Sequence, residues 1–182
     1  MSPTYVKSQR PVWLLNEIVM KKLGISIGVL ATFVCFSVRA QTTTVMTLDQ
    51  AGAKKVLQAA VEVAGQRNAT AAVAVVDPAG DLLAFQRMDG VRPASVDLAI
   101  EKARTAARLQ RPTEEIEDNI NRGRTAFVTA GIAALRGGVP IRLNGQVVGA
   151  VGIASLSKET DTAIANSAAA ALNPSPITAQ PR

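Results

Sequence analysis

The chain has 182 residues, with 20 basic and 14 acidic side chains, a formal net charge of +6 and an isoelectric point near 10. Residues 1–40 contain five of the bases and one acid, so the following 142 residues carry 15 bases and 13 acids. These 142 residues contain no histidine and no cysteine, and their only aromatic residues are Phe85 and Phe127. This composition excludes a Cys/His zinc site, a Ser-His-Asp triad, a thiol nucleophile and a disulfide. It also argues against nucleic-acid binding, which needs basic surface and stacking rings.

An internal segment has the pattern of a secretory signal peptide. Met20 is followed by two lysines, and a mostly apolar run then ends near Ala40. We therefore expect residues 20–40 to be a signal peptide and the mature protein to be periplasmic or secreted, with no stable membrane anchor after processing. A membrane anchor is the weaker alternative, because the apolar run is short for a membrane span. Residues 1–19 fit no part of a signal and are interpreted as an upstream extension.

The first predicted elements of the mature chain are a helix and a β-hairpin. Thr47 is expected to cap the helix, with Gln50 at the capping-box spacing, and apolar residues then recur at the period of one buried helical face until Asn68. Residues 71–76 are apolar at every position, which predicts a strand buried on both faces. A turn containing Pro and Gly leads to a second strand at 82–85.

Two helices and a second hairpin follow. A helix is predicted over residues 95–110, and Thr113 is expected to cap the next helix, whose acidic first turn suits a helix N-terminus. Asn144-Gly145 is the strongest short hairpin signal, and it joins strands predicted at 141–143 and 147–153.

The last predicted helix covers residues 158–172, and residues 173–182 are expected to form a disordered tail. Two hairpins separated by helices predict a single α+β domain over residues 41–172. Its central antiparallel β-sheet would be flanked by helices.

The helix at 95–110 has three different faces when its residues are placed at roughly 100° intervals. One face is apolar, one is charged, and the third sets one ammonium and two hydroxyls among leucines. This third face fits a pocket wall or a subunit interface that binds an anionic or carbonyl-bearing group; alternatively, Lys102 extends past its neighbours to water. The three faces are Val96, Ala99, Ile100, Ala103, Ala106 and Ala107; Asp97, Glu101, Arg104 and Arg108; and Ser95, Leu98, Lys102, Thr105 and Leu109.

Two further segments carry candidate site residues. The thioether of Met88 is able to ligate haem iron or to pack on a flat cofactor, although most methionines are packing residues. Its neighbours Arg87 and Asp89 are more typical of a local ion pair or a turn cap than of catalysis. Gly137 and Gly138 would allow a backbone to approach a ligand, or would simply end a helix.

The carboxylates form two groups that are able to bind a hard cation. Turn and helix-start roles explain both groups, so we predict no metal site. No phosphate-binding glycine loop occurs in the sequence. The two groups are Asp77 and Asp81, and Glu114, Glu115, Glu117 and Asp118.

Several short motifs occur together in the order and spacing of a known family. They are residues 74–90, Ala94-Ser95 with residues 101–106, residues 111–113, residues 137–141 and residues 145–152. This pattern resembles the GlcG/HbpS family of haem-degrading or haem-binding domains, and the match runs from Met46 to Leu172.

The resemblance implies an α+β domain that assembles as a homo-oligomer, often an octamer. It also implies haem as a cofactor, since some relatives bind haem, and others are secreted redox sensors that present haem-derived iron to a partner. Two positions depart from the pattern: Gly80-Asp81 stands where many relatives have Gly-His, and Ser155-Leu156 where Ser-Gly is usual. Because the chain has no histidine, imidazole ligation of haem is excluded.

Three functions are consistent with these residues. The first is an exported homo-oligomer that binds haem, a related tetrapyrrole or a small anionic ligand, and serves haem handling or degradation. The second is an enzyme acting on a small oxo- or hydroxy-acid, with Lys102 as base or electrostatic stabiliser. The third is a non-catalytic accessory protein whose third helix face is buried between subunits. The expected ligand-binding residues are Arg87, Met88, Asp89, Ser95, Lys102, Thr105, Gly137 and Gly138.

Overall fold

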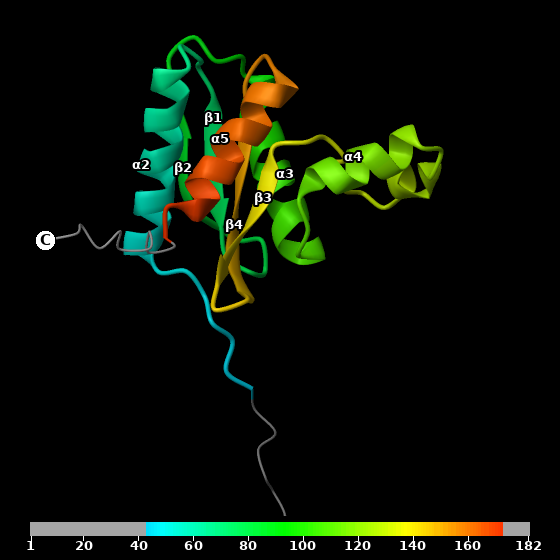
Figure 1. Ribbon diagram of the computed structural model, residues 1–182, viewed down its shortest axis with the longest axis horizontal. Helices are drawn as coiled ribbons and strands as arrows, with labels where there is room; N and C mark the ends of the chain where they lie inside the picture. Colours follow the sequence, from blue (N-terminus) through cyan, green and yellow to red (C-terminus); the bar gives the residue numbers. More distant parts are fainter. Residues whose placement is uncertain (1–42, 173–182) are drawn as a thin grey trace, which may run out of the picture. The chain divides into compact units, whose positions relative to one another are not determined.

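Four strands form one antiparallel sheet in the order β2-β1-β4-β3 (Figure 1). The computed structural model describes residues 43–172, so the predicted upstream extension, signal peptide and tail lie outside the described residues. The strands are β1 (Ala72–Val76), β2 (Leu82–Arg87), β3 (Gly138–Leu143) and β4 (Gln146–Ala154).

Helices lie on both faces of this sheet. Helices α2 and α5 pack on one face, and α3 packs on the other, against β1 and β4 (Figure 1). The helices are α2 (Gln50–Gln66), α3 (Ala94–Leu109), α4 (Thr113–Asn121) and α5 (Lys158–Ala170), with a 3₁₀ helix, η1 (Thr125–Thr129), after α4. The predicted α+β class, with a central antiparallel sheet flanked by helices, is confirmed.

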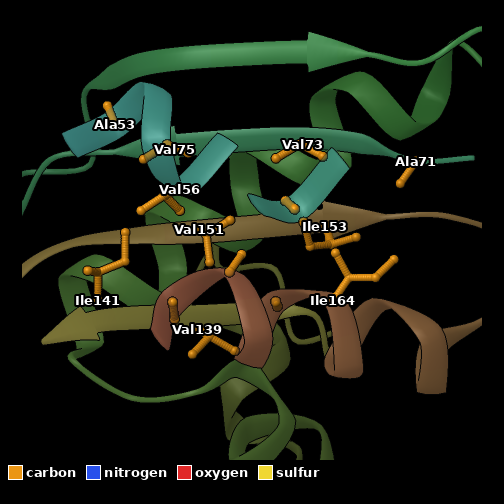
Figure 2. Close-up of a cluster of buried hydrophobic side chains, with 14 of the residues drawn as sticks. Ala53, Val56, Ala71, Val73, Val75, Val139, Ile141, Val151, Ile153 and Ile164 are labelled. Carbon is orange, nitrogen blue, oxygen red and sulfur yellow. The ribbon is translucent and has the colours of Figure 1, made fainter. Parts of the chain in front are cut away.

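The main core lies between the sheet and the helices α2 and α5. Branched side chains from strands and helices interdigitate there, and Figure 2 shows Val73, Val75 and Ile153 beside Val56 and Ile164. All five residues of β1 are buried, as the unbroken apolar run predicts. Burial of such side chains from water is the main source of stability for a domain of this size.

The opposite face of the sheet is packed with small residues. Alanines of β1 and β4 meet Ala99, Ala103 and Ala106 of α3. A Cβ atom on Gly152 of β4 would collide with the carbonyl oxygen of Ala99. The small residues therefore let the α3 backbone approach the sheet closely.

Both predicted hairpins are present. β1 pairs with β2, and β3 pairs with β4 across Asn144-Gly145, where both residues have positive φ values of 51° and 80°. This matches the two-residue turn with both central residues in the left-handed region. β3 starts at Gly138, three residues before the predicted start, and includes Pro140 at the edge of the sheet.

Two predicted helix caps are wrong. Asp49, not Thr47, caps α2 by accepting a hydrogen bond from the Gly52 amide at 2.7 Å. Thr47 precedes Leu48, whose amide donates to the Val148 carbonyl, so the chain is still extended there. Thr113 is the first residue of α4 and is fully buried, because its hydroxyl pairs with the backbone of Gly138.

The segment from Thr113 to Arg136, which we call the arm, comprises α4, η1 and the loop that returns to β3. Its main contacts with the rest of the domain are with α3 and β3, and Lys158 Nζ of α5 lies 3.7 Å from Glu117 Oε1. Among residues 121–131, only Phe127 is partly buried. The arm therefore contributes little to the core.

Candidate functional site

The predicted ligand-binding residues fall into two places in the fold. One group lies in the interior, where α3 meets the β-sheet and α5. The other lies at the end of β2 and the start of α3. The interior group is Lys102, Thr105, Gly137 and Gly138, and the second group is Arg87, Met88, Asp89 and Ser95.

Lys102 forms a buried ion pair. Its side chain is 3% exposed, and its Nζ donates to Asp161 Oδ2 at 2.8 Å and to the Ile153 carbonyl at 2.9 Å. The other carboxylate oxygen of Asp161 accepts from the Ser155 amide at 2.7 Å. Lys102 therefore joins α3 to β4 and α5. It does not extend to water, and it lines none of the surface hollows described below.

The two glycines approach protein backbone. The Gly138 amide donates to Thr113 Oγ1 at 2.9 Å, and the Gly137 carbonyl accepts from the Ile153 amide at 2.8 Å. A Cβ atom on Gly138 would collide with the carbonyl oxygen of Lys102. The close approach that these glycines allow is therefore to α3 for Gly138, and to Ile153 of β4 and Asp161 of α5 for Gly137.

Thr105 has a structural partner as well. Its hydroxyl accepts a hydrogen bond from the Ala133 amide at 3.0 Å, which attaches the end of the arm to α3. Leu98 is half-buried, and Leu109 is 38% exposed. The third helix face is therefore mostly interior, because the arm covers it at Thr105 and α5 covers it at Lys102.

At the end of β2, Arg87 holds the following loop. Its Nη2 and Nε donate to the Val91 carbonyl at 2.6 and 3.0 Å. Of the two roles expected for it, the turn cap is the one observed. Met88 is half-buried and packs against both hydrophobic clusters, whereas Asp89 is exposed.

Three loops meet at this end of the sheet. Strand register explains why, since Ala72 at the start of β1 lies opposite both Arg87 at the end of β2 and Ala154 at the end of β4. The loops before β1, after β2 and after β4 line two adjoining surface hollows of about 60 and 300 Å³. We call these two hollows together the loop-end cleft. Its lining residues are Arg67, Asn68, Ala69, Thr70, Gly90, Val91, Arg92, Ser95, Ser155, Leu156, Ser157 and Thr160.

The strongest charge cluster lies on the arm, around Arg136. Its guanidinium contacts Glu114 at 3.0 Å, Glu117 at 3.0 Å and Asp118 at 2.8 Å. Burial raises the pKa of Glu117, but hydrogen bonds from the Arg136 amide and guanidinium outweigh burial and hold that pKa below its ordinary value. The hydrogen bond to Glu117 in turn raises the pKa of Arg136.

The first acidic group has the turn role expected for it, and the second, expected at a helix start, forms ion pairs as well. Asp77 Oδ1 accepts from the Asp81 amide at 2.8 Å and so closes the first turn. Three of the four α4 carboxylates bind Arg136. Within residues 43–172, no three His, Cys, Asp or Glu side chains are grouped to hold a metal ion. No helix in this range is long and apolar enough to cross a bilayer.

The sequence analysis missed most of the loop-end cleft. Of its lining residues it predicted only Ser95; Arg67, Arg92 and Thr160 were not singled out. The hairpin pattern already places the start of β1 beside the end of β2, and therefore places the loops that carry Arg67 and Arg92 at the same end of the sheet. The loop after β4 forms the remaining wall of the cleft. Its position depends on the pairing of β1 with β4, for which the sequence carries no local signal.

Comparisons with known proteins give consistent results. Residues 48–170 match a family model described as haem degrading protein HbpS-like. The chain is 44% identical over 111 residues to Protein GlcG of Escherichia coli K12, which covers 60% of this chain and 83% of that protein.

Solved structures share the fold. A double mutant of HbpS from Streptomyces reticuli has a TM-score of 0.68 and 34% identity, covering 74% of this chain and 92% of that one. A PduOC:haem complex has a TM-score of 0.64 and 29% identity, covering 70% of this chain and 96% of that one.

The single antiparallel sheet and the helices on both its faces define an α+β domain of the kind found in these solved structures. The chain belongs to the HbpS-like family. The resemblance to the GlcG/HbpS family stated from the motifs is thereby confirmed.

Proposed function

We propose that this protein binds a tetrapyrrole, haem being the first candidate, and serves haem handling or degradation. The observation that carries the proposal is the similarity to PduOC, which was solved as a haem complex and which this chain matches over 96% of that chain's length. The description of the matched family as haem degrading supports the same ligand class.

The geometry favours the end of β2 as the place where a ring would contact the protein. Lys102 and the two glycines are enclosed by protein, whereas Arg87 and Asp89 are exposed and Met88 is half-buried. An exposed guanidinium suits a propionate, and a thioether is a soft ligand for iron. We call Arg87, Met88 and Asp89 at the end of β2 the Met88 corner. In a chain without histidine, Met88 is the natural iron-contacting group there.

The enzyme hypothesis built on Lys102 finds no support in the geometry. A lysine acting as base needs access to substrate and an ammonium that loses its proton readily. The Lys102 ammonium is 3% exposed and paired with Asp161. We therefore do not propose catalysis by Lys102.

Haemin titration of the purified full chain tests the ligand. We expect a Soret band that saturates, with weaker binding for Met88→Leu and Arg87→Gln, and unchanged binding for Met46→Leu, in which an exposed methionine outside this corner is replaced. Absence of a saturable Soret change in the wild type would contradict tetrapyrrole binding. Equal affinity of all variants would contradict only the proposed location.

We further propose that the protein is a homo-oligomer, an octamer by resemblance, and that the arm contributes to its interface. Val128 and Leu135 on the arm are 67% and 49% exposed, and their burial between subunits would remove apolar surface from water. Sedimentation of Val128→Asp is expected to show smaller species than the wild type. The matched control is Val45→Asp, which changes a valine that is 66% exposed outside the arm. A monomeric wild type, or dissociation by the control alone, would contradict the proposal.

Export after Ala40 also remains a proposal. It is supported by the basic and apolar pattern of residues 20–40. Fractionation of cells producing the full chain, followed by mass determination, is expected to give a periplasmic or secreted protein beginning at Gln41. A full-length cytoplasmic product would contradict export.

A further inference from the structure

We propose that the loop-end cleft binds a small dicarboxylate. This ligand is independent of the tetrapyrrole proposed above, because the cleft needs no ring and lies mainly on residues outside the Met88 corner. The proposal rests on two arginines, one hydroxyl that lines the cleft, two helix ends and the size of the space.

The cleft brings together two arginines from different loops. Arg67 follows α2 and Arg92 precedes α3; both are exposed, and within residues 43–172 neither forms an ion pair. Arginine is well suited to a carboxylate, since its planar fork donates two parallel hydrogen bonds. Two such groups, one in each of two adjoining hollows, suit a ligand with a carboxylate at each end.

Ser95 adds a hydroxyl to the lining of the smaller hollow. The residue as a whole is 3% exposed, but within residues 43–172 no side-chain oxygen or nitrogen is both fully buried and without a partner. The hydroxyl is therefore reached from the hollow, and it is able to donate to or accept from a group that enters there.

Two helices begin at the cleft. Ser95 lies in the first turn of α3, and Ser157 caps α5, whose first turn includes Thr160. Helix N-termini carry partial positive charge, which favours anions. The contribution here is that of the helix dipoles, since the amides of Ser95 and Thr160 already donate to Arg92 and Ser157. The α3 and α5 N-termini thus add to the field of the two arginines.

Two carboxylates near the cleft oppose this field. Glu159 Oε2 accepts from the Ser157 hydroxyl at 3.1 Å, and bonds to its own backbone amide and to Ser157 lower the pKa of Glu159, so it is charged at neutral pH. Asp89 is exposed beside Gly90. Asp161 is already neutralised by Lys102. Neither Glu159 nor Asp89 lines the two hollows.

The volume of the loop-end cleft limits the size of a ligand that it is able to hold. The two hollows share Thr70, Ser155 and Leu156 and measure about 300 and 60 Å³. This is at the lower end for small-molecule sites and too small to enclose a tetrapyrrole. The side chain of Leu156, 81% exposed at the shared wall, is placed to cover the carbon chain of a bound dicarboxylate.

Calorimetric titration of the full chain with succinate tests this inference, with succinamide as the uncharged analogue and inorganic phosphate as a second anion. We expect succinate to bind in the millimolar range or tighter and succinamide not to bind. Arg67→Gln and Arg92→Gln should each weaken succinate about tenfold or more, and Ser95→Ala several-fold. Arg122→Gln, which changes an exposed arginine on the arm, is the matched control and should leave affinity unchanged.

Three outcomes would overturn the proposal: no succinate binding, equal binding of succinamide, or equal affinity of the wild type and the Arg67→Gln, Arg92→Gln double variant. Tighter binding of phosphate than of succinate would overturn the dicarboxylate assignment. Thermal unfolding shows whether each variant is folded. Haemin titration of the same double variant separates the two sites: retained haemin binding with lost succinate binding is expected, and loss of both would contradict two independent sites.

Discussion

The ammonium of Lys102 and the carboxylate of Asp161 meet at 2.8 Å inside the domain, and their side chains are only 3% and 5% exposed. Each also bonds backbone of β4 or its following loop, at Ile153 and Ser155. The pair therefore fixes where α3 and α5 sit relative to the end of β4. Since the loop after β4 forms one wall of the loop-end cleft, the buried pair positions that wall.

Breaking this pair is expected to destabilise the fold strongly. Lys102→Met leaves the Asp161 charge buried without its partner and should lower the free energy of unfolding by about 3–5 kcal/mol. Urea denaturation at fixed protein concentration measures the change. The control is Arg104→Ala, which removes an i,i+3 pair whose side chains are 37% and 47% exposed and should cost less than about 1 kcal/mol. Equal effects of the two variants would contradict the structural role of Lys102.

The contact between Glu117 and Arg136 makes stability depend on pH. Because the pKa of Glu117 is lowered in the folded protein, its ionised form stabilises the fold above its ordinary pKa of about 4.5, and this contribution is lost as the pH falls through the lowered value. We expect Glu117→Gln to reduce the loss of stability on acidification below about pH 4.5. Glu115→Gln on the same helix forms none of the described ion pairs and should retain the wild-type dependence. The check is a series of urea unfolding curves across this pH range.

Two glycine-to-alanine changes should have opposite signs. Gly152→Ala drives a methyl group into the backbone of α3 at Ala99 and is expected to cost about 1–3 kcal/mol or more. Gly65→Ala lies in α2 with open space around its Cβ position and should stabilise by about 0.5–1 kcal/mol. Thermal unfolding of both variants measures this. A tolerated Gly152→Ala would mean that α3 does not pack on β4 as closely as described.

The buried hydroxyl of Thr113 should be energetically important. Thr113→Val keeps the shape but removes the acceptor for the Gly138 amide, and leaving that buried amide unpaired costs about 1–3 kcal/mol. Hydrogen exchange of the Gly138 amide is expected to accelerate in this variant. Thr162→Val is the control, since its exposed hydroxyl only bonds the Lys158 carbonyl one turn earlier. Unchanged exchange at Gly138 would contradict this role.

Most of the secondary structure follows from local sequence. The all-apolar residues 71–76 and the Asn144-Gly145 turn predicted both hairpins, because turn chemistry and side-chain periodicity act over a few residues. The helix over residues 94–109 was predicted to within one residue at each end. Thr47 and Thr113 were predicted wrongly as caps because of contacts with distant strands, which no local pattern records. The amide of Leu48, next to Thr47, donates to the Val148 carbonyl of β4, and the Thr113 hydroxyl accepts from the Gly138 amide of β3.

The candidate site was harder to predict than the fold. The sequence correctly marked one face of α3 as unusual, but it did not show that Lys102 would meet Asp161, 59 residues later. It placed Ser95, Lys102 and Thr105 on one helix face, and the structure buries all three. Ser95 is the one predicted residue that lines the cleft.

The sequence by itself determined the helices, the two hairpins, the α+β class and, through the family motifs, the HbpS-like assignment. It also determined, by the absence of histidine, that imidazole does not ligate any bound haem. Only the tertiary structure decided that β1 pairs with β4, that the three loops therefore converge, and that the ammonium of Lys102 is neutralised. The reason is physical: hairpins and helices are stabilised by neighbours along the chain, whereas strand order and buried ion pairs depend on contacts between distant residues that form only when the whole core is packed.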